Sequence, residues 1–166
     1  MDKGARPYSE DALELKLSLE VGVIGVDEVI TWADTLLGEV AEYDDDLANI
    51  CLAKDASVKA LISLLRIVIG ECKEWNAMRR TMARMHEALV DDPNRARGFV
   101  RFLEQFWIRH DYDVPEDMDF IVGIEDEFQL AEQGTYGTVV EAKASLLESL
   151  SHFRKYIRPG LSQAQT

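Results

Sequence analysis

The spacing of apolar residues constrains the fold of this 166-residue chain most strongly. Between glycine and proline positions, apolar side chains recur every three or four residues, which is the period of one face of an α-helix. About seven or eight such segments follow one another, joined by short links. We therefore predict an all-α fold with a single domain over residues 1–166, arranged as an irregular bundle or a stack of helix pairs. The ends, 1–8 and 160–166, are expected to be flexible.

Residues 12–21 fit two interpretations. Leucines at positions 13, 15, 17 and 19 alternate with polar residues, as in a half-buried strand. Leu13, Leu17 and Val21 also follow helical spacing, and leucine and glutamate are good helix formers. We predict a helix that ends at Gly22, with the strand as the open alternative.

The other helices are predicted from their caps and from glycine or proline at their ends. Gly25 and Gly38 bracket one helix, Ser57 caps another, and Thr138 caps the last, which Pro159 stops. The remaining predictions are a short helix over 40–53, a break or kink near Gly70, a helix over 71–90, one that starts at Asp92-Pro93, and one that Pro115 opens.

Composition indicates a cytoplasmic protein. The chain has two cysteines, Cys51 and Cys72, which excludes a disulfide scaffold and fits a reducing compartment. Both lie in apolar helical segments, so we interpret them as packed thiols. The start of the chain has no secretory signal, and the most apolar stretch, 58–69, contains two charges and is too short to span a bilayer.

Charge is unevenly distributed along the chain. The formal net charge is −13, from 31 acidic and 18 basic residues. Residues 1–72 carry 15 acids and 6 bases, and residues 110–142 carry ten acids with no lysine or arginine. The other two blocks, 73–109 and 143–166, each carry a net positive charge. Such an anion gains nothing from binding nucleic acid directly, whereas it would attract a basic protein.

Two acidic clusters are the candidate partner-binding residues. One is a run of three aspartates, and the other surrounds a tyrosine, an arrangement that suits the centre of a protein interface. The alternative is that these carboxylates only keep the chain dissolved. The residues are Asp44, Asp45, Asp46, Asp111, Tyr112, Asp113, Glu116, Asp117 and Asp119.

Motifs for metals, cofactors and catalysis fail at required positions. Asp111-Tyr112-Asp113 begins like a calcium loop, but Pro115 takes a ligand position and Glu116 replaces the required glycine. No histidine has the glutamate spacing of a di-iron bundle, and no zinc motif is present. We therefore expect no metal, no cofactor and no catalytic residues.

One enzymatic alternative stays open. Arg79 and Arg80 precede His86 at the arginine–histidine spacing of helical HEPN ribonucleases. A histidine can move the proton of a ribose hydroxyl, and an arginine can stabilise the negative charge that develops on phosphate. The alternative to a site is a solvated basic face that pairs with acidic segments of the same chain.

Three short motifs resemble those of small, uncharacterised, all-helical immunity-type proteins of bacterial polymorphic toxin loci. They are Val29-Ile30-Thr31-Trp32-Ala33-Asp34, Ser63-Leu64-Leu65, and Tyr112-Asp113-Val114-Pro115-Glu116-Asp117-Met118. The resemblance implies a cytoplasmic immunity protein that binds and neutralises a cognate toxin. It carries over no catalytic residues, and Val114 departs from the aromatic residue expected before the proline.

The sequence thus predicts a non-enzymatic protein that neutralises a cognate toxin with a basic surface through its acidic clusters. It does not bind nucleic acid or membranes directly in this interpretation. An acidic nucleic-acid mimic, a regulatory interaction protein and a HEPN-like ribonuclease are the alternatives. The sequence predicts neither the toxin's activity nor the oligomeric state.

Overall fold

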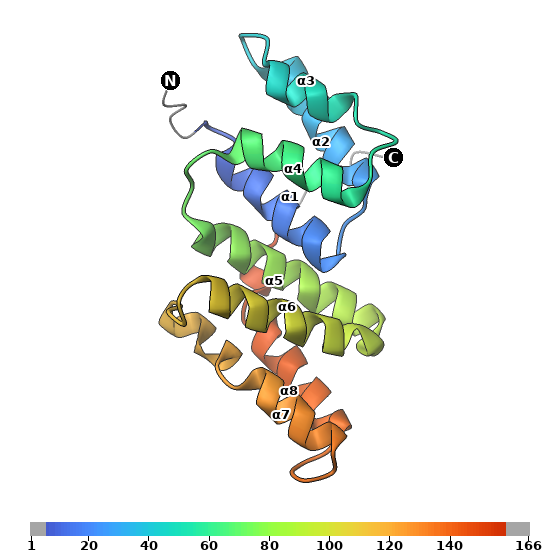
Figure 1. Cartoon of the computed structure of the whole chain (residues 1–166), viewed down its shortest axis with the longest axis vertical. Helices are drawn as coiled ribbons and strands as arrows, with labels where there is room; N and C mark the ends of the chain where they lie inside the picture. The colour runs from blue at the N-terminus through green and yellow to red at the C-terminus, as the bar shows by residue number, and fades with distance from the viewer. Residues whose placement is uncertain (1–5, 159–166) are drawn as a thin grey trace. The chain divides into compact units, whose positions relative to one another are not determined.

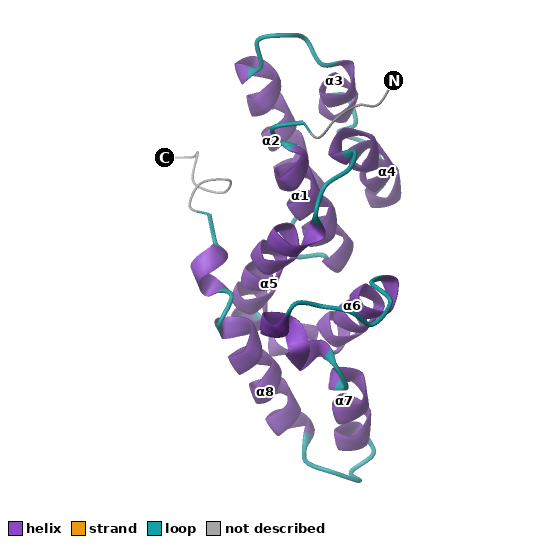
Figure 2. Ribbon diagram, turned by 90° about the vertical axis from the view of Figure 1, so that its left-hand side faces the viewer, coloured by secondary structure: helices purple, strands orange, loops and turns teal. Residues whose placement is uncertain are grey.

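The computed structural model describes residues 6–158, in which every regular element is a helix (Figures 1 and 2). The predicted all-α fold is confirmed for this part of the chain. The α-helices are α1 Ser9–Val21, α2 Val26–Glu39, α3 Asp45–Cys51, α4 Val58–Ile69, α5 Glu74–Asp91, α6 Ala96–Arg109, α7 Ile124–Glu132 and α8 Val139–Ser151. Three short 3₁₀ helices accompany them: η1 Pro93–Arg95, η2 Glu116–Ile121 and η3 Arg154–Tyr156.

The helices group into two compact units. Unit 1 comprises residues up to Thr81 together with the segment from Ile157, and unit 2 comprises Met82–Tyr156. The boundary falls within α5, which is one continuous helix. The single-domain organisation stays a prediction.

Helix α1 is buried around its whole circumference. Seven consecutive residues, from Leu13 to Leu19, are all buried, including Glu14 and Lys16. This burial explains why the leucines alternate with polar residues in a helix: no side of α1 faces solvent in its middle, so apolar residues are not confined to one stripe. Of the two alternatives for residues 12–21, the helix is confirmed and the strand is wrong. Gly22 ends the helix with φ 78°, as predicted.

The other helices of unit 1 cover α1 and one another. Helix α4 packs along α1, and α3 lies against both α2 and α4. Ser57 caps α4 as predicted, by accepting a hydrogen bond from the Ala60 N–H. The chain is interrupted after Ile69, so the break near Gly70 separates two helices.

Two predicted helix ends in unit 1 are wrong. Helix α2 continues through Gly38 to Glu39, because that glycine is tolerated inside the last turn. The predicted helix over 40–53 is shorter, because Asp44 folds into an N-cap and delays the start of α3 to Asp45.

Unit 2 is built around the aromatic face of α6. Phe99, Leu103 and Phe106 are buried there, as the spacing predicted, and α6 packs against α7, which packs against α8. Asp92-Pro93 starts a 3₁₀ turn, and α6 follows it. Thr138 caps α8 through a reciprocal pair of hydrogen bonds with Glu141.

Two long helices predicted in unit 2 are each divided. Pro115 opens only the 3₁₀ helix η2, because Gly123 adopts φ 79°, a conformation that no right-handed helix contains, and α7 starts after it. The last helix stops at Ser151 instead of continuing to Pro159, and η3 follows.

The start of the described chain is packed. Tyr8 is buried and stands edge-on to Trp32, with ring centroids 6.4 Å apart. Arg6 and Tyr8 therefore belong to the folded unit although the sequence placed them in a flexible end. Residues 1–5 and 159–166, which include the predicted flexible end 160–166, lie outside the described residues.

Candidate protein-binding surfaces

The link between α6 and η2 adopts an unusual backbone. Asp111 and Tyr112 have φ values of 53° and 65°, so two successive non-glycine residues are left-handed. The Tyr112 N–H donates to the Trp107 carbonyl oxygen at 3.1 Å, and the Asp113 N–H donates to that of His110 at 3.0 Å. These bonds hold the link in one conformation in spite of its conformational cost.

Aromatic residues of α6 pack against the same link. The Tyr112 and Trp107 rings are nearly perpendicular, with centroids 4.9 Å apart, while Tyr112 itself is 63% exposed. The His110 ring packs on Phe106 at 4.4 Å. The indole N–H of Trp107 is buried and has no hydrogen-bond acceptor within residues 6–158, which is a further cost at this position.

Residues 111–119, here called the Tyr112 loop, present five carboxylates to solvent. Asp111, Asp113, Glu116, Asp117 and Asp119 are all exposed, whereas Met118 points into the core. For four of them, Asp117 being the exception, no ion pair or side-chain hydrogen bond is found within residues 6–158. The predicted cluster therefore exists in the folded unit, and four of its five carboxylates have no cationic partner within residues 6–158.

Other acids of unit 2 are paired. Arg97 donates two hydrogen bonds of 2.6 Å to the Glu125 carboxylate and lies 3.4 Å from Glu132. The hydrogen bonds that Arg97 donates to Glu125 raise the pKa of Arg97 further. Glu141 is engaged in the cap of α8. The acidic stretch 110–142 is thus partly neutralised beyond its loop.

The second predicted cluster, Asp44–Asp46, is divided by the structure. Asp44 caps α3 and accepts a hydrogen bond from the Tyr8 hydroxyl, and Arg6 lies 3.2 Å from Asp44 and 2.5 Å from Asp46. Burial opposes ionisation of Asp44, but the bonds from Tyr8 and Leu47 and the charge of Arg6 hold its pKa below the ordinary range. Asp44 and Asp46 therefore stabilise unit 1.

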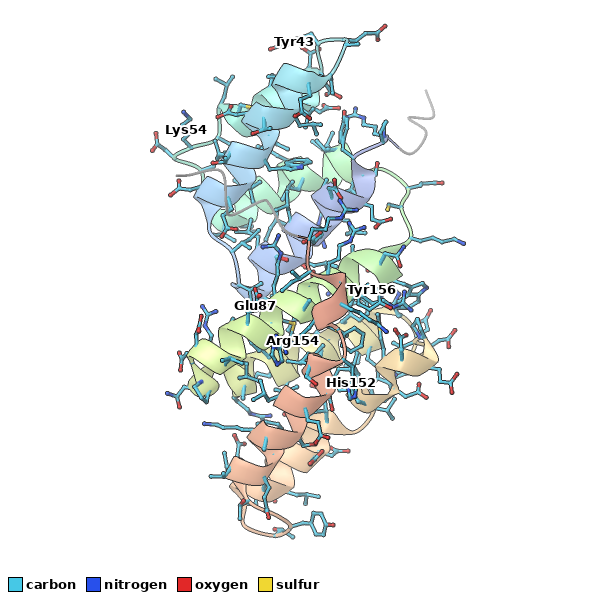
Figure 3. The ribbon with its side chains drawn as sticks, turned by 180° about the vertical axis from the view of Figure 1, so that it is seen from behind. Tyr43, Lys54, Glu87, His152, Arg154 and Tyr156 are labelled. Carbon is cyan, nitrogen blue, oxygen red and sulfur yellow. The ribbon has the colours of Figure 1, made fainter. Side chains whose placement is uncertain are left out.

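An open groove borders this cluster in unit 1. It measures about 630 Å³ and has an apolar part formed by Pro7, Tyr8, Leu36 and Val40 and acidic positions at Asp11, Glu39, Glu42 and Asp44. Asp45 is exposed, and so is Tyr43, which lies 75% exposed at the turn before α3 (Figure 3). An exposed tyrosine beside carboxylates thus occurs in both units.

Carboxylates of α1 are neutralised internally. Arg80 lies 2.5 Å from Glu10, 3.1 Å from Asp11 and 3.6 Å from Glu14, and Arg158 lies 2.5 Å from Asp11. Lys16 pairs with Glu20 at 3.0 Å. Sequence spacing gave no sign of the pairs formed by Arg80, because Arg80 is about 70 residues from its partners.

In the residues of the ribonuclease alternative, both arginines are paired and the histidine is buried. Arg80 is held by the three carboxylates of α1, and Arg79 donates to Asn76. His86 is 9% exposed, and burial, together with the charge of Arg154, lowers its pKa. A buried imidazole is poorly placed to reach a ribose hydroxyl.

The two cysteines are unreactive by environment. Both are half-buried free thiols. Burial and the carboxylate of Asp34 raise the pKa of Cys51 to about 11, and burial with Glu10 raises that of Cys72. Since the thiolate is the nucleophile, these values disfavour nucleophilic catalysis.

Within the described chain, no group of three or more histidine, cysteine or acidic side chains is arranged to hold a metal ion. None of the helices there has the length and apolarity needed to cross a membrane. Comparison with protein-family models, curated proteins and solved structures finds no match to this chain.

Proposed function

We propose that the chain is an immunity-type binding protein that neutralises a cognate toxin by covering a basic surface of it with the Tyr112 loop. The observation that carries the proposal is the state of this loop. Carboxylates at 111, 113, 116 and 119 are exposed and have no cationic partner in the described part of the chain, and they surround a tyrosine that is exposed yet packed against Trp107.

The cost of the loop's backbone supports a binding role. Left-handed non-glycine residues and buried unpaired donors gather at functional sites, because folding alone gives no reason to keep them. Here both occur together, at Asp111, Tyr112 and Trp107. A preformed loop also loses little entropy on binding.

Charge explains how such a loop would find its partner. Clustered carboxylates accelerate encounter with a basic surface by roughly 10- to 1,000-fold at low salt. Aromatic residues at the centre of an interface contribute much of its affinity. Tyr112 is therefore the expected anchor, and the carboxylates set the choice of a basic partner.

The kind of partner comes from the sequence resemblance to immunity-type proteins of toxin loci. In such loci the two genes are neighbours, so the product of the adjacent gene is the first partner to test. The proposal places the complex in the cytoplasm of the producing cell, where the toxin would otherwise act. Catalysis is not part of it, because Arg80 is held by carboxylates of α1 and His86 is buried.

The test is co-expression with the neighbouring gene product, followed by measurement of cell growth and of association rates with purified proteins. Wild-type protein should restore growth. Reversal of Asp111, Asp113 and Asp119 to lysine should slow association at least about tenfold and abolish protection. The matched control reverses Glu87, Asp91 and Glu148, three exposed acids of the same unit, with the same change in net charge.

Equal loss of protection in both triple variants would contradict the assignment of the loop. Competition by the wild-type protein against DNA for many unrelated basic proteins would instead identify a nucleic-acid mimic. Degradation of RNA that disappears in His86→Ala would identify a ribonuclease and overturn the proposal.

A further inference from the structure

A small pocket opens beside Trp107 in unit 2. It measures about 190 Å³. Helix α6 contributes Glu104 and Trp107, which share one face of the helix, and the end of η2, residues 122–123 and the first turn of α7 contribute the rest of the lining. The lining residues are Glu104, Trp107, Ile121, Val122, Gly123, Glu125 and Asp126.

The pocket combines an apolar part with three carboxylates. Trp107, Ile121 and Val122 form the apolar part, and Val122 is 53% exposed although it is a large aliphatic residue. Among the carboxylates, Glu125 is held by Arg97. Asp126 is exposed and has no ion-pair or hydrogen-bond partner within residues 6–158, and the half-buried Glu104 interacts with Arg97 only through its charge.

This chemistry fits one long cationic side chain. The volume is below the roughly 300–1,000 Å³ of pockets for small organic molecules. The stem of a lysine or arginine can lie on apolar surface while its charged end meets carboxylates. An indole favours guanidinium in particular, because the planar group stacks on the ring and then still donates to a carboxylate.

The pocket is also continuous with the Tyr112 loop, because Tyr112 packs against the same indole that lines it. We propose that this pocket takes an arginine side chain of the basic protein that the Tyr112 loop binds. The inference rests on the proposed function and makes it more specific: the loop attracts a cationic surface, and the pocket selects arginine over lysine on that surface.

The test measures binding of fluorescently labelled hexa-arginine and hexa-lysine peptides to the full chain, with the indole N–H resonance of Trp107 as a second readout. Wild-type protein should bind hexa-arginine about three- to tenfold more tightly than hexa-lysine. The Trp107 resonance should shift when hexa-arginine binds. Glu104→Gln with Asp126→Asn, and separately Val122→Arg, should remove the preference. Val122→Arg changes an exposed position, so it leaves the core intact.

Matched variants separate this inference from the proposed function. Glu87→Gln with Glu127→Gln neutralises two exposed acids outside the pocket and should retain the preference. Neutralising Asp111, Asp113 and Asp119 should weaken the binding of both peptides equally. The preference for hexa-arginine should remain.

Equal affinity of wild-type protein for the two peptides, or a preference that survives both pocket variants, would overturn the pocket assignment while leaving the loop's role intact. Peptide binding that is unaffected by the loop variant would instead contradict the role of the loop. If the wild-type protein binds neither peptide, both the pocket assignment and the role of the loop are contradicted.

Discussion

Tyr112 packs edge-on against Trp107, and it reaches that position only because Asp111 and Tyr112 are both left-handed. The ring centroids are 4.9 Å apart, and the Tyr112 N–H donates to the Trp107 carbonyl oxygen. Most of the Tyr112 side chain is nevertheless exposed. The loop therefore holds a large aromatic residue at the surface at a conformational cost. Substitution at the left-handed positions should reveal this cost as a change in stability.

Replacing Asp111 with glycine should stabilise the protein. A left-handed conformation costs a non-glycine residue about 1 kcal/mol, and glycine avoids that cost, although its greater freedom in the unfolded chain offsets a part. The Asp111 side chain is exposed and makes no ion pair within residues 6–158, so no contact is lost. We expect an increase of a few tenths to about 1 kcal/mol in the free energy of unfolding in urea.

Asp113→Gly is the control, because Asp113 is equally exposed but is not left-handed. It should destabilise the protein slightly. If both variants are more stable than the wild type, the left-handed backbone of Asp111 does not explain the increase in the free energy of unfolding.

Asp44→Ala should destabilise unit 1 by about 2–3 kcal/mol. The substitution removes the cap of α3, leaves the hydroxyl of the buried Tyr8 without its acceptor, and takes away one of the two carboxylates that pair with Arg6. Asp45→Ala, at the exposed neighbour, should change stability by less than about 0.5 kcal/mol. Urea unfolding of the two variants measures the difference, and similar effects would contradict the structural role of Asp44.

The protein should lose stability as pH falls below about 6.5 because of His86. The pKa of His86 is lowered in the folded state, first by burial and then by the charge of Arg154. The unfolded chain therefore binds this proton at higher pH than the folded chain, so protonation favours unfolding until the pH passes below the folded pKa. Unfolding curves at pH 7.5 and 5.5 should show the loss.

His86→Leu should reduce this loss between pH 7.5 and 5.5, whereas His152→Gln, at an exposed histidine, should retain it. The contribution of Asp44 falls in a separate range. Because its pKa lies below the ordinary value, its stabilisation is complete above about pH 4 and is lost only at lower pH. A pH profile that is unchanged in His86→Leu would assign the acid sensitivity to another group.

Arg97→Gln should destabilise unit 2 by about 1 kcal/mol and strengthen binding of hexa-arginine. The substitution removes the two hydrogen bonds to Glu125, which is partly exposed, so the loss is modest. It also leaves Glu125 as an uncompensated anion at the pocket. Weaker peptide binding by this variant, measured at low salt, would contradict the role of local charge.

Helix type and caps were accessible from the sequence, because they depend on neighbouring residues. Ser57, Thr138 and Gly22 end or begin helices where the local pattern indicated. Boundaries failed where one residue's conformation decided them, as at Gly123. Its left-handed backbone divides an apolar pattern that otherwise continues across η2 and α7.

The candidate site was accessible only in part. Carboxylate clusters and Tyr112 are visible in the sequence, but their pairing depends on residues distant in the chain. Arg6 neutralises Asp44 and Asp46 from 38 and 40 positions away, and no local pattern indicates this. The contact between Tyr112 and Trp107 depends on backbone angles that aspartate and tyrosine rarely adopt, so spacing could not predict it.

The burial of α1 on every side has a consequence for how this chain can vary. A helix with one solvent-facing side accepts polar replacements at half or more of its positions, whereas Leu13 to Leu19 offers none. A saturation-mutagenesis profile of this segment would therefore be uniformly intolerant, without the three-to-four-residue rhythm that usually reveals a helix. Related sequences should diverge last along α1, and labelling of unit 1 is best directed to exposed positions next to α3, such as Tyr43 and Leu52.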